Sequence, residues 1–350
     1  MARYLLFGTE LYALPILRPL AAAIARRGDE ARWFLHGFNA APYLGADELR
    51  CASVREVMRF RPDAVLAAAN WVPDFFPGLK VQVFHGFNVE KRDAARGHFR
   101  VRGLFDVYCT QGPATTEPFQ QIQARDPHFR VVETGWPKLD PLFAAHDAQA
   151  DAWRAQAHGR PVVLYGATFT ERLSSAPHLA DEIARLIAQG RWYWLLTLHP
   201  KCPAEWFARY RALAGPNACF VESDRLVSLL RAADVLVSDT SSIVSEFVVQ
   251  HKPVVTWRNR AAKPHMIDID RVTALAPAID TALAPTEELR AALRTYANAI
   301  HPHRDGRASE RVLDAVAAFT PTGLRPKPGN WWRRLQMRAK LGWFGRATQR

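Results

Sequence analysis

The chain has 350 residues, a length that predicts two domains at about 150 residues each. Its composition, 49% hydrophobic and 23% charged residues, excludes disorder as the main state. The formal net charge is +12, but eight cationic and no acidic residues fall within residues 321–350, so the preceding part carries only +4. This is a mildly basic globule with a basic tail, unlike a uniformly basic nucleic-acid binder.

Cysteine usage and the apolar profile bear on where the chain works. The four cysteines are scattered and none stands in a CxxC pair, which argues against a disulfide framework and a cysteine-based zinc site. The first 25 residues are broken by Glu10, Pro15, Arg18 and Pro19, unlike a secretory leader. No apolar run reaches the roughly 18 residues of a membrane span. We therefore expect a cytoplasmic protein.

Short apolar runs alternate with helical stretches through the first half of the chain. Strands are expected at residues 3–7, 31–35, 64–69, 80–84, 107–110 and 130–133. Helices are expected at residues 14–27, 54–60 and 116–124, the first ending at Gly28. This alternation with short connections predicts a doubly wound parallel sheet.

A second series follows a strand-free crossing segment, residues 141–160. Its strands are expected at residues 161–165, 192–198, 219–221, 234–238 and 253–257, and its helices at 179–189, 226–232, 242–250 and 309–319. Two series of similar size predict an α/β protein with two Rossmann-like domains facing a cleft. We place the domains at residues 1–157 and 158–320 and a basic amphipathic tail at residues 321–350.

Five consecutive polar residues join a strand to a helix in the second domain. They are Ser238, Asp239, Thr240, Ser241 and Ser242. Working residues of open α/β sheets lie just past the carboxyl ends of strands, and a helix N-terminus with nearby hydroxyls favours a phosphate. A simple N-cap would need only one such residue, so we favour phosphate binding, with capping as the alternative.

Two histidines also follow predicted strands. His199 stands before Pro200 and Lys201, and it is either a phosphate donor and acid–base group or a strand-end histidine without a task. His85 precedes Gly86, which lets a ligand approach the backbone, and it is either a general base for a hydroxyl or a turn histidine. Spacing alone leaves these alternatives open.

Two further loops at strand ends are candidates for ligand contact. One contains Thr168 and Arg172, and the other, TGWPKLD at residues 134–140, contains Lys138 and Asp140, which would face the cleft if the domains meet there. The Gly and Pro of the second loop are also those of an ordinary turn. The DxD at residues 268–270 has no suitably spaced third ligand, so no metal site is expected.

The tail combines aromatic and cationic residues. Residues 330–344, NWWRRLQMRAKLGWF, contain Trp331, Trp332, Trp343 and Phe344. Tryptophans at an interface with Lys and Arg near anionic headgroups are typical of a membrane-surface segment. A helix packed back on the first domain and a nucleic-acid arm are the alternatives, and we favour membrane association over nucleic acid.

Six stretches together resemble the teichoic-acid-type CDP-glycerol glycerophosphotransferase family, which has a GT-B fold. They are VFHGFNVEK at residues 83–91, TGWPKLD at 134–140, VLYGATFTER at 163–172, LTLHP at 196–200, the segment 226–255 that contains SDTSS, and DGRASERV at 305–312. The resemblance spans about residues 80–318. The order of the six stretches is more specific than any one of them.

The resemblance implies transfer of glycerol phosphate, or a related alditol phosphate, from a CDP-linked donor to a hydroxyl of a membrane-associated glycan or lipid-linked acceptor. It implies catalytic His85 and His199, with a donor domain at residues 158–320 and an acceptor-side domain at 1–157. It assigns the donor nucleotide and phosphate to Thr168, Arg172, Ser238, Asp239, Thr240, Ser241, Ser242 and Glu246. It assigns the acceptor to Gly86, Lys91, Lys138 and Asp140.

No metal or other cofactor is expected, and the protein would sit on the inner face of the cell membrane, bound to an anionic surface through its tail. A nucleotide-sugar glycosyltransferase of lipopolysaccharide or capsule synthesis would use the same pyrophosphate site and differ only in its donor. A catalytically silent scaffold of the same fold is the third alternative.

Overall fold

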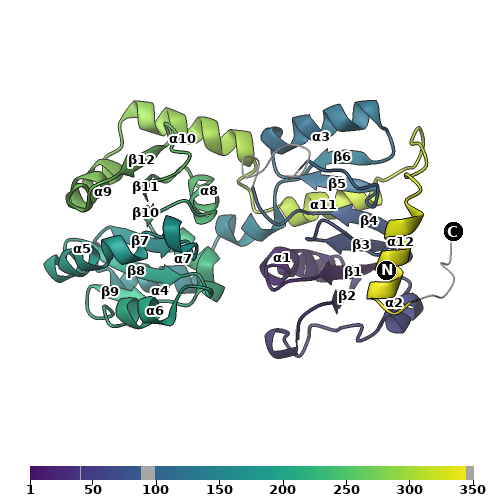
Figure 1. The fold of residues 1–350 in the computed structure, drawn as a ribbon, viewed down its shortest axis with the longest axis horizontal. Helices are drawn as coiled ribbons and strands as arrows, with labels where there is room; N and C mark the ends of the chain where they lie inside the picture. The colour runs from purple at the N-terminus through teal and green to yellow at the C-terminus, as the bar shows by residue number, and fades with distance from the viewer. Residues whose placement is uncertain (40, 88–98, 344–350) are drawn as a thin grey trace. The chain divides into compact units, whose positions relative to one another are not determined.

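The computed structural model describes residues 1–39, 41–87 and 99–343. The chain forms two compact units, one made of Met1–Asp140 with Asp305–Arg350 and the other of Pro141–Arg304 (Figure 1). We call them unit 1 and unit 2. In the described part of the chain, no helix is both long and apolar enough to span a bilayer.

Unit 1 contains a six-stranded parallel sheet. Its strand order is β2 (Glu30–Leu35), β1 (Arg3–Gly8), β3 (Ala64–Ala67), β4 (Leu79–Gln82), β5 (Val107–Thr110) and β6 (Arg130–Glu133). The accompanying helices are α1 (Ala13–Arg26), α2 (Val54–Phe60), α3 (Pro113–Arg125), α11 (Ala308–Ala317) and α12 (Trp331–Lys340). The central strands are buried on both faces, which explains their continuous apolar runs.

Helix α1 shows how local sequence fixes this layer. Leu17, Leu20 and Ile24 recur every three or four residues and are fully buried. Helix α2 begins at Ser53, whose hydroxyl accepts the Glu56 backbone N–H, and ends at Arg61, which has φ 49°. The core beneath these helices is rich in aromatic side chains, among them Phe7, Phe34, Phe76, Tyr108 and Phe119.

Unit 2 contains a second six-stranded parallel sheet. Its strand order is β12 (Met266–Ile269), β11 (Val254–Trp257), β10 (Val235–Ser238), β7 (Val162–Ala167), β8 (Tyr193–Leu198) and β9 (Ala218–Phe220). Its helices are α4 (Ala148–Gln156), α5 (Ala176–Gln189), α6 (Ala204–Arg211), α7 (Leu226–Ala232), α8 (Ile243–Val248), α9 (Leu275–Leu283) and α10 (Glu287–Ile300). Strand order reverses between β7 and β10, and such a switch point favours a ligand site at the carboxyl ends.

The predicted fold class, two Rossmann-like α/β units, is confirmed, but the chain divides differently from the predicted boundaries at residues 157 and 320. Helix α11 belongs to unit 1, where it packs against α1, because Arg27 pairs with Glu310 at 2.8 Å and Asp314 at 2.7 Å. The crossing segment belongs to unit 2, where α4 packs on α7. Strand β12 was not predicted, since its half-buried edge sequence MIDI lacks an apolar run.

Candidate active site

Four loops of unit 2 come together at the carboxyl edge of its sheet. They follow β7, β8, β10 and β11, the strands around the switch point. The Cys202 thiol of the second loop lies 3.9 Å from the Thr168 carbonyl oxygen of the first. The Asn259 side chain of the fourth loop donates to the Asp239 carbonyl of the third at 3.1 Å. The structure therefore brings together most of the residues that the sequence assigned to the donor.

Asp239 and Ser238 hold this edge together from inside. The fully buried Asp239 carboxylate accepts the Thr168 N–H at 3.0 Å, the Ser175 N–H at 2.8 Å and the Ser175 hydroxyl at 2.9 Å. The Ser238 hydroxyl donates to the Gly166 carbonyl at 2.6 Å. Burial raises the pKa of Asp239, and these hydrogen bonds oppose that shift. Both side chains are directed to protein partners, so they organise the edge rather than contact a phosphate.

The rest of the polar cluster lies nearer the surface. Thr240 is half-buried, and its hydroxyl oxygen accepts the Arg260 backbone N–H at 3.1 Å. Ser241 is half-buried and Ser242 exposed, and the Ser242 side chain makes no capping hydrogen bond to α8. Glu246 is buried on α8. Because α8 has only six residues, its dipole is weak, and the available phosphate donors are mainly the hydroxyls of residues 240–242.

His199 follows β8, two strands from β10 in the sheet, and has an aromatic and a cationic residue near it. Its Nδ1 accepts the Lys201 backbone N–H at 3.1 Å, so the neutral ring carries its proton on Nε2. The Phe169 ring, 42% exposed, lies 4.4 Å from the imidazole, and the Lys201 ammonium lies 5.7 Å from the Phe169 ring. Burial and then Lys201 lower the pKa of His199. Arg172, on the turn Glu171–Leu173, is exposed.

His85 lies in unit 1, beyond the carboxyl end of β4. Phe84, immediately before it, has φ 57°, a left-handed conformation that costs a bulky residue about 1–3 kcal/mol. The Trp136 indole N–H donates to the Phe84 carbonyl at 3.4 Å, and the Gln111 amide donates to the Gly86 carbonyl at 3.0 Å. The backbone on both sides of His85 is therefore held by side chains from the next two strand ends.

The environment of His85 favours its neutral form. The ring lies 5.3 Å from that of Tyr12, which follows β1. Burial lowers the pKa of His85, an effect that the Ala68 backbone partly offsets. Nδ1 is buried and has no hydrogen-bond partner among the described residues. A neutral imidazole is the form that can accept a proton from a hydroxyl.

The TGWPKLD loop, residues 134–140, has a structural role that the sequence did not predict. The Asp140 carboxylate accepts the backbone N–H of Ala308 at 2.7 Å and of Ser309 at 2.8 Å, so it caps α11 instead of facing a ligand. Arg311 pairs with Asp305 and donates to the Thr134 carbonyl at 3.4 Å. Two stretches of the family resemblance, TGWPKLD and DGRASERV, thus contact each other within unit 1.

Of the remaining acceptor candidates, Lys138 is described by the structure and Lys91 is not. The Lys138 ammonium lies 5.2 Å from the Trp136 ring, next to the loop that holds His85. Lys91 lies outside the described residues, as does Phe344 of the tail.

Sequence reasoning did not single out four residues that complete these sites. They are Tyr12 in unit 1 and Phe169, Asn259 and Arg260 in unit 2. Their position just past a strand could have identified them, as the sequence RNRAAK directly after the strand VVTW shows. Within the described part of the chain, no three His, Cys, Asp or Glu side chains gather as a metal cluster. Asp268 instead accepts the Thr256 hydroxyl at 2.6 Å.

Comparisons with known proteins bear on this geometry. Among solved structures, the wall teichoic acid polymerase TagF is similar over 90% of this chain and 88% of its own, with a TM-score of 0.64 at 12% identity. The UDP-GlcNAc 2-epimerase from Neisseria meningitidis, bound to UDP-GlcNAc, is similar over 91% and 100%, with a TM-score of 0.60 at 13% identity. These identities show the fold alone, which is GT-B-like as predicted. No curated protein matches the chain.

A family model is more specific than the fold and matches part of the chain. Residues 100–263 match the model described as CDP-Glycerol:Poly(glycerophosphate) glycerophosphotransferase. The matching segment includes Thr168, His199 and the cluster 238–242, whereas His85 and α11 lie outside it. The resemblance predicted from the six sequence stretches is therefore confirmed over residues 100–263, the segment that is similar to the CDP-glycerol glycerophosphotransferases.

Proposed function

We propose that the chain transfers glycerol phosphate, or a related alditol phosphate, from a CDP-linked donor to a hydroxyl of a membrane-associated cell-envelope glycan or lipid-linked acceptor. The observation that carries the proposal is the carboxyl edge of the unit 2 sheet. There, the hydroxyls of residues 240–242 follow β10 at the switch point and His199 follows β8 on the same edge, all within the segment that matches the family model. Both the family and the chemistry of the edge suit a pyrophosphate.

On the donor side, the diphosphate lies against Thr240, Ser241 and Ser242, with the His199 Nε2–H directed to a phosphate oxygen. The exposed Phe169 ring offers a stacking surface for the cytosine base. Asp239 contributes indirectly, by fixing the backbone of Thr168 and Ser175. Neutral donors and nearby cations stabilise the charge that develops on the leaving phosphate.

On the acceptor side, His85 takes the proton of the attacking hydroxyl. The hydroxyl oxygen forms a bond to the phosphorus that carries the alditol, and the bond from that phosphorus to the bridging oxygen breaks. CMP leaves with the bridging oxygen, and the proton remains on His85 until it is released to solvent. The transfer needs no resident metal, because cationic and hydrogen-bonding side chains take the charge-stabilising role.

The enzyme works on the inner face of the cell membrane, where an anionic surface holds it through residues 321–350. This placement rests on the tail's composition and on the exposure of its tryptophans, Trp331 and Trp332.

The test is CMP release from CDP-glycerol in the presence of acceptor-bearing membranes, quantified by mass spectrometry. We expect release by the wild type and a loss of about 10²–10⁴-fold in His85→Ala, the range typical of a general base. His146→Ala is the matched control, since that histidine is exposed and lies 2.9 Å from the carboxylate of Asp151 at the surface. Consumption of UDP-sugars with CDP-glycerol left intact would contradict the proposal.

A further inference from the structure

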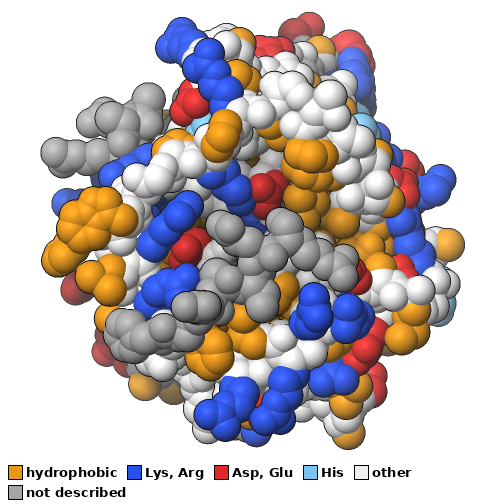
Figure 2. Space-filling view, turned by 90° about the vertical axis from the view of Figure 1, so that its right-hand side faces the viewer, with side chains coloured by type: hydrophobic (Ala, Val, Ile, Leu, Met, Phe, Trp, Pro, Cys, Tyr) orange, Lys and Arg blue, Asp and Glu red, His pale blue; other side chains and the backbone are white. Residues whose placement is uncertain are grey.

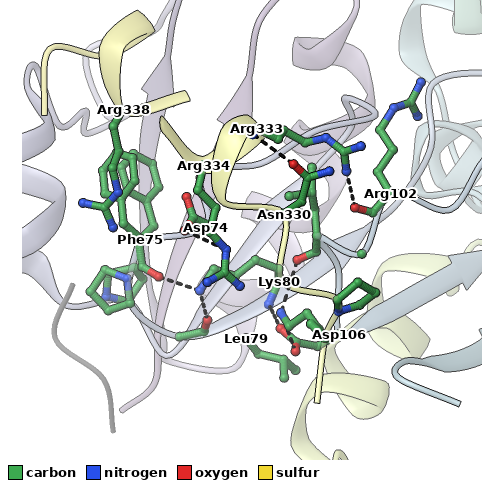
Figure 3. Close-up of a pocket in the computed structure, with 18 of the residues that line it drawn as sticks. Asp74, Phe75, Leu79, Lys80, Arg102, Asp106, Asn330, Arg333, Arg334 and Arg338 are labelled. Atoms are coloured by element: carbon green, nitrogen blue, oxygen red, sulfur yellow. Dashed lines mark hydrogen bonds and ion pairs between the residues drawn. The ribbon is translucent and has the colours of Figure 1, made fainter. Parts of the chain in front are cut away.

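A basic groove of about 930 Å³ lies in unit 1, at the edge of the sheet opposite His85. Its walls are the starts of β1, β3, β4 and β5, the loop before β5, and the inner side of α12 (Figure 3). The tail therefore does more than carry charge, because it forms one wall of a site whose other walls belong to the globule.

Positive charge dominates the groove. Eight Lys or Arg side chains and three Asp side chains line it. The carboxylates have partners in the protein: Asp106 lies 2.6 Å from the Lys327 ammonium, Asp74 lies 3.5 Å from Arg334, and Asp63 accepts the Arg3 backbone N–H at 2.9 Å. The cations therefore exceed the carboxylates by five, and an anion from outside can be attracted.

Two of the cations in the groove, Lys80 and Arg333, are held in place by hydrogen bonds to backbone carbonyls. The Lys80 side chain, 7% exposed, donates to the Phe76 carbonyl at 2.5 Å and to the Gly78 carbonyl at 2.6 Å. Burial and then Lys327 lower the pKa of Lys80 to about 8. Arg333 donates to the Arg102 carbonyl, and Figure 3 shows the Arg102 guanidinium extending away from that contact.

Neighbouring cations disfavour each other here. Burial lowers the pKa of Arg102, and the charges of Arg100 and Arg333 lower it further. Crowded like charges that remain uncompensated are relieved by a bound anion, and planar guanidinium groups match phosphate oxygens in pairs. The chemistry of the groove therefore fits a phosphate ester.

The outward face of α12 adds a second, independent feature. Met337 is buried in the core of unit 1, whereas Trp331 is 72% exposed, Trp332 56% and Leu335 42%. A helix packed on a soluble protein ordinarily presents polar residues outward. Figure 2, viewed from the side on which α12 lies, shows Lys and Arg side chains gathered with hydrophobic side chains exposed among them. Tryptophan beside cations is the pattern of a membrane interface.

We propose that this groove binds the phosphate of an anionic phospholipid headgroup while Trp331, Trp332 and Leu335 enter the interface. The inference rests on the proposed membrane placement and goes beyond it, since the headgroup site uses Arg61 and Arg102 of the globule as well as the tail. It assigns the end of unit 1 opposite His85 to the lipid surface, and it does not depend on which donor the enzyme uses.

The experiment measures sedimentation of the full chain with vesicles of phosphatidylcholine alone and of phosphatidylcholine mixed with phosphatidylglycerol. Each cation near an anionic leaflet contributes a factor of about five to binding, so Arg61→Gln/Arg102→Gln should bind the mixed vesicles about 25-fold more weakly. Arg271→Gln/Arg290→Gln removes the same charge from exposed positions of unit 2 and should bind as the wild type does. Trp331→Ala/Trp332→Ala should weaken binding to both vesicle types.

A second arm identifies the source of the phosphate. Soluble glycerophosphate polymer is titrated into the wild type and the Arg61→Gln/Arg102→Gln variant without vesicles. Loss of polymer binding with vesicle binding intact would make the occupant a polymer and overturn the proposal, as would equal vesicle binding by all variants. CMP release from CDP-glycerol and the thermal midpoint are measured on the same samples, so a misfolded variant or a wrong donor assignment is recognised separately.

Discussion

Asp239→Ala tests whether the buried carboxylate organises the donor edge or contacts the donor. The substitution removes the acceptor of the Thr168 N–H, the Ser175 N–H and the Ser175 hydroxyl, all within 3.0 Å of a carboxylate oxygen. Ser175 immediately precedes α5, so the same carboxylate also ties the start of that helix to the end of β10. An organising role therefore predicts a large loss of stability.

The expected loss of stability follows from the three hydrogen-bond donors that lose their acceptor. A buried donor left without a partner costs about 1–3 kcal/mol, and water admitted by the smaller side chain recovers part of this. Three donors give a loss of about 3–5 kcal/mol. In a unit of this size, Pro141–Arg304, each kcal/mol lowers the thermal midpoint by about 2–4 °C, so we expect a decrease of about 10 °C.

The assay is thermal unfolding by calorimetry, with binding of CDP-glycerol measured well below the midpoint. Asp181→Ala is the control, because its carboxylate is exposed and pairs with Arg209 at the surface. Asp239→Asn, which retains one acceptor oxygen, should lie between the control and Asp239→Ala. An Asp239→Ala protein with the wild-type midpoint and no donor binding would refute the organising role and make the carboxylate a ligand contact.

Three further predictions concern the His85 base, the Asp140 cap of α11 and the metal-free mechanism. Because burial lowers the pKa of His85 below its usual 6.5, the rate of CMP release should stay constant as pH falls to about 6.5 and decline only below it. A decline beginning above about pH 7 would contradict a base that is neutral and half-buried. Asp140→Ala should lower the free energy of unfolding in urea by about 1–2 kcal/mol, since α11 loses its cap, and an unchanged midpoint would contradict that role. Treatment with EDTA should leave CMP release unchanged, and loss of activity restored by a divalent cation would overturn the metal-free mechanism.

Strand positions were predictable because parallel strands buried on both faces leave continuous apolar runs in the sequence, as in PVVLY and DVLVS. The packing partner of a helix was not predictable, because an apolar stripe shows that one face is buried but does not show which element covers it. Helix α11 follows unit 2 in sequence yet packs in unit 1, through a carboxylate 168 residues away at Asp140.

The candidate sites were predictable as loops but not as individual contacts. Position past a strand end found His85, His199 and the cluster 238–242. It did not separate Asp239 from Ser241, because a carboxylate or hydroxyl at such a loop can serve a phosphate or an internal N–H equally well. The basic groove was invisible in the sequence, since it joins Arg61, Arg102 and Arg333 from segments far apart along the chain.

The central claim is that unit 2 binds a CDP-alditol at the carboxyl edge of its sheet. The most direct measurement is a calorimetric titration of CDP-glycerol and of UDP-N-acetylglucosamine into the wild type and a Ser241→Ala variant. We predict that CDP-glycerol binds the wild type, that its affinity falls in the variant, and that the UDP-sugar does not bind. Binding of the UDP-sugar without binding of CDP-glycerol would contradict the account.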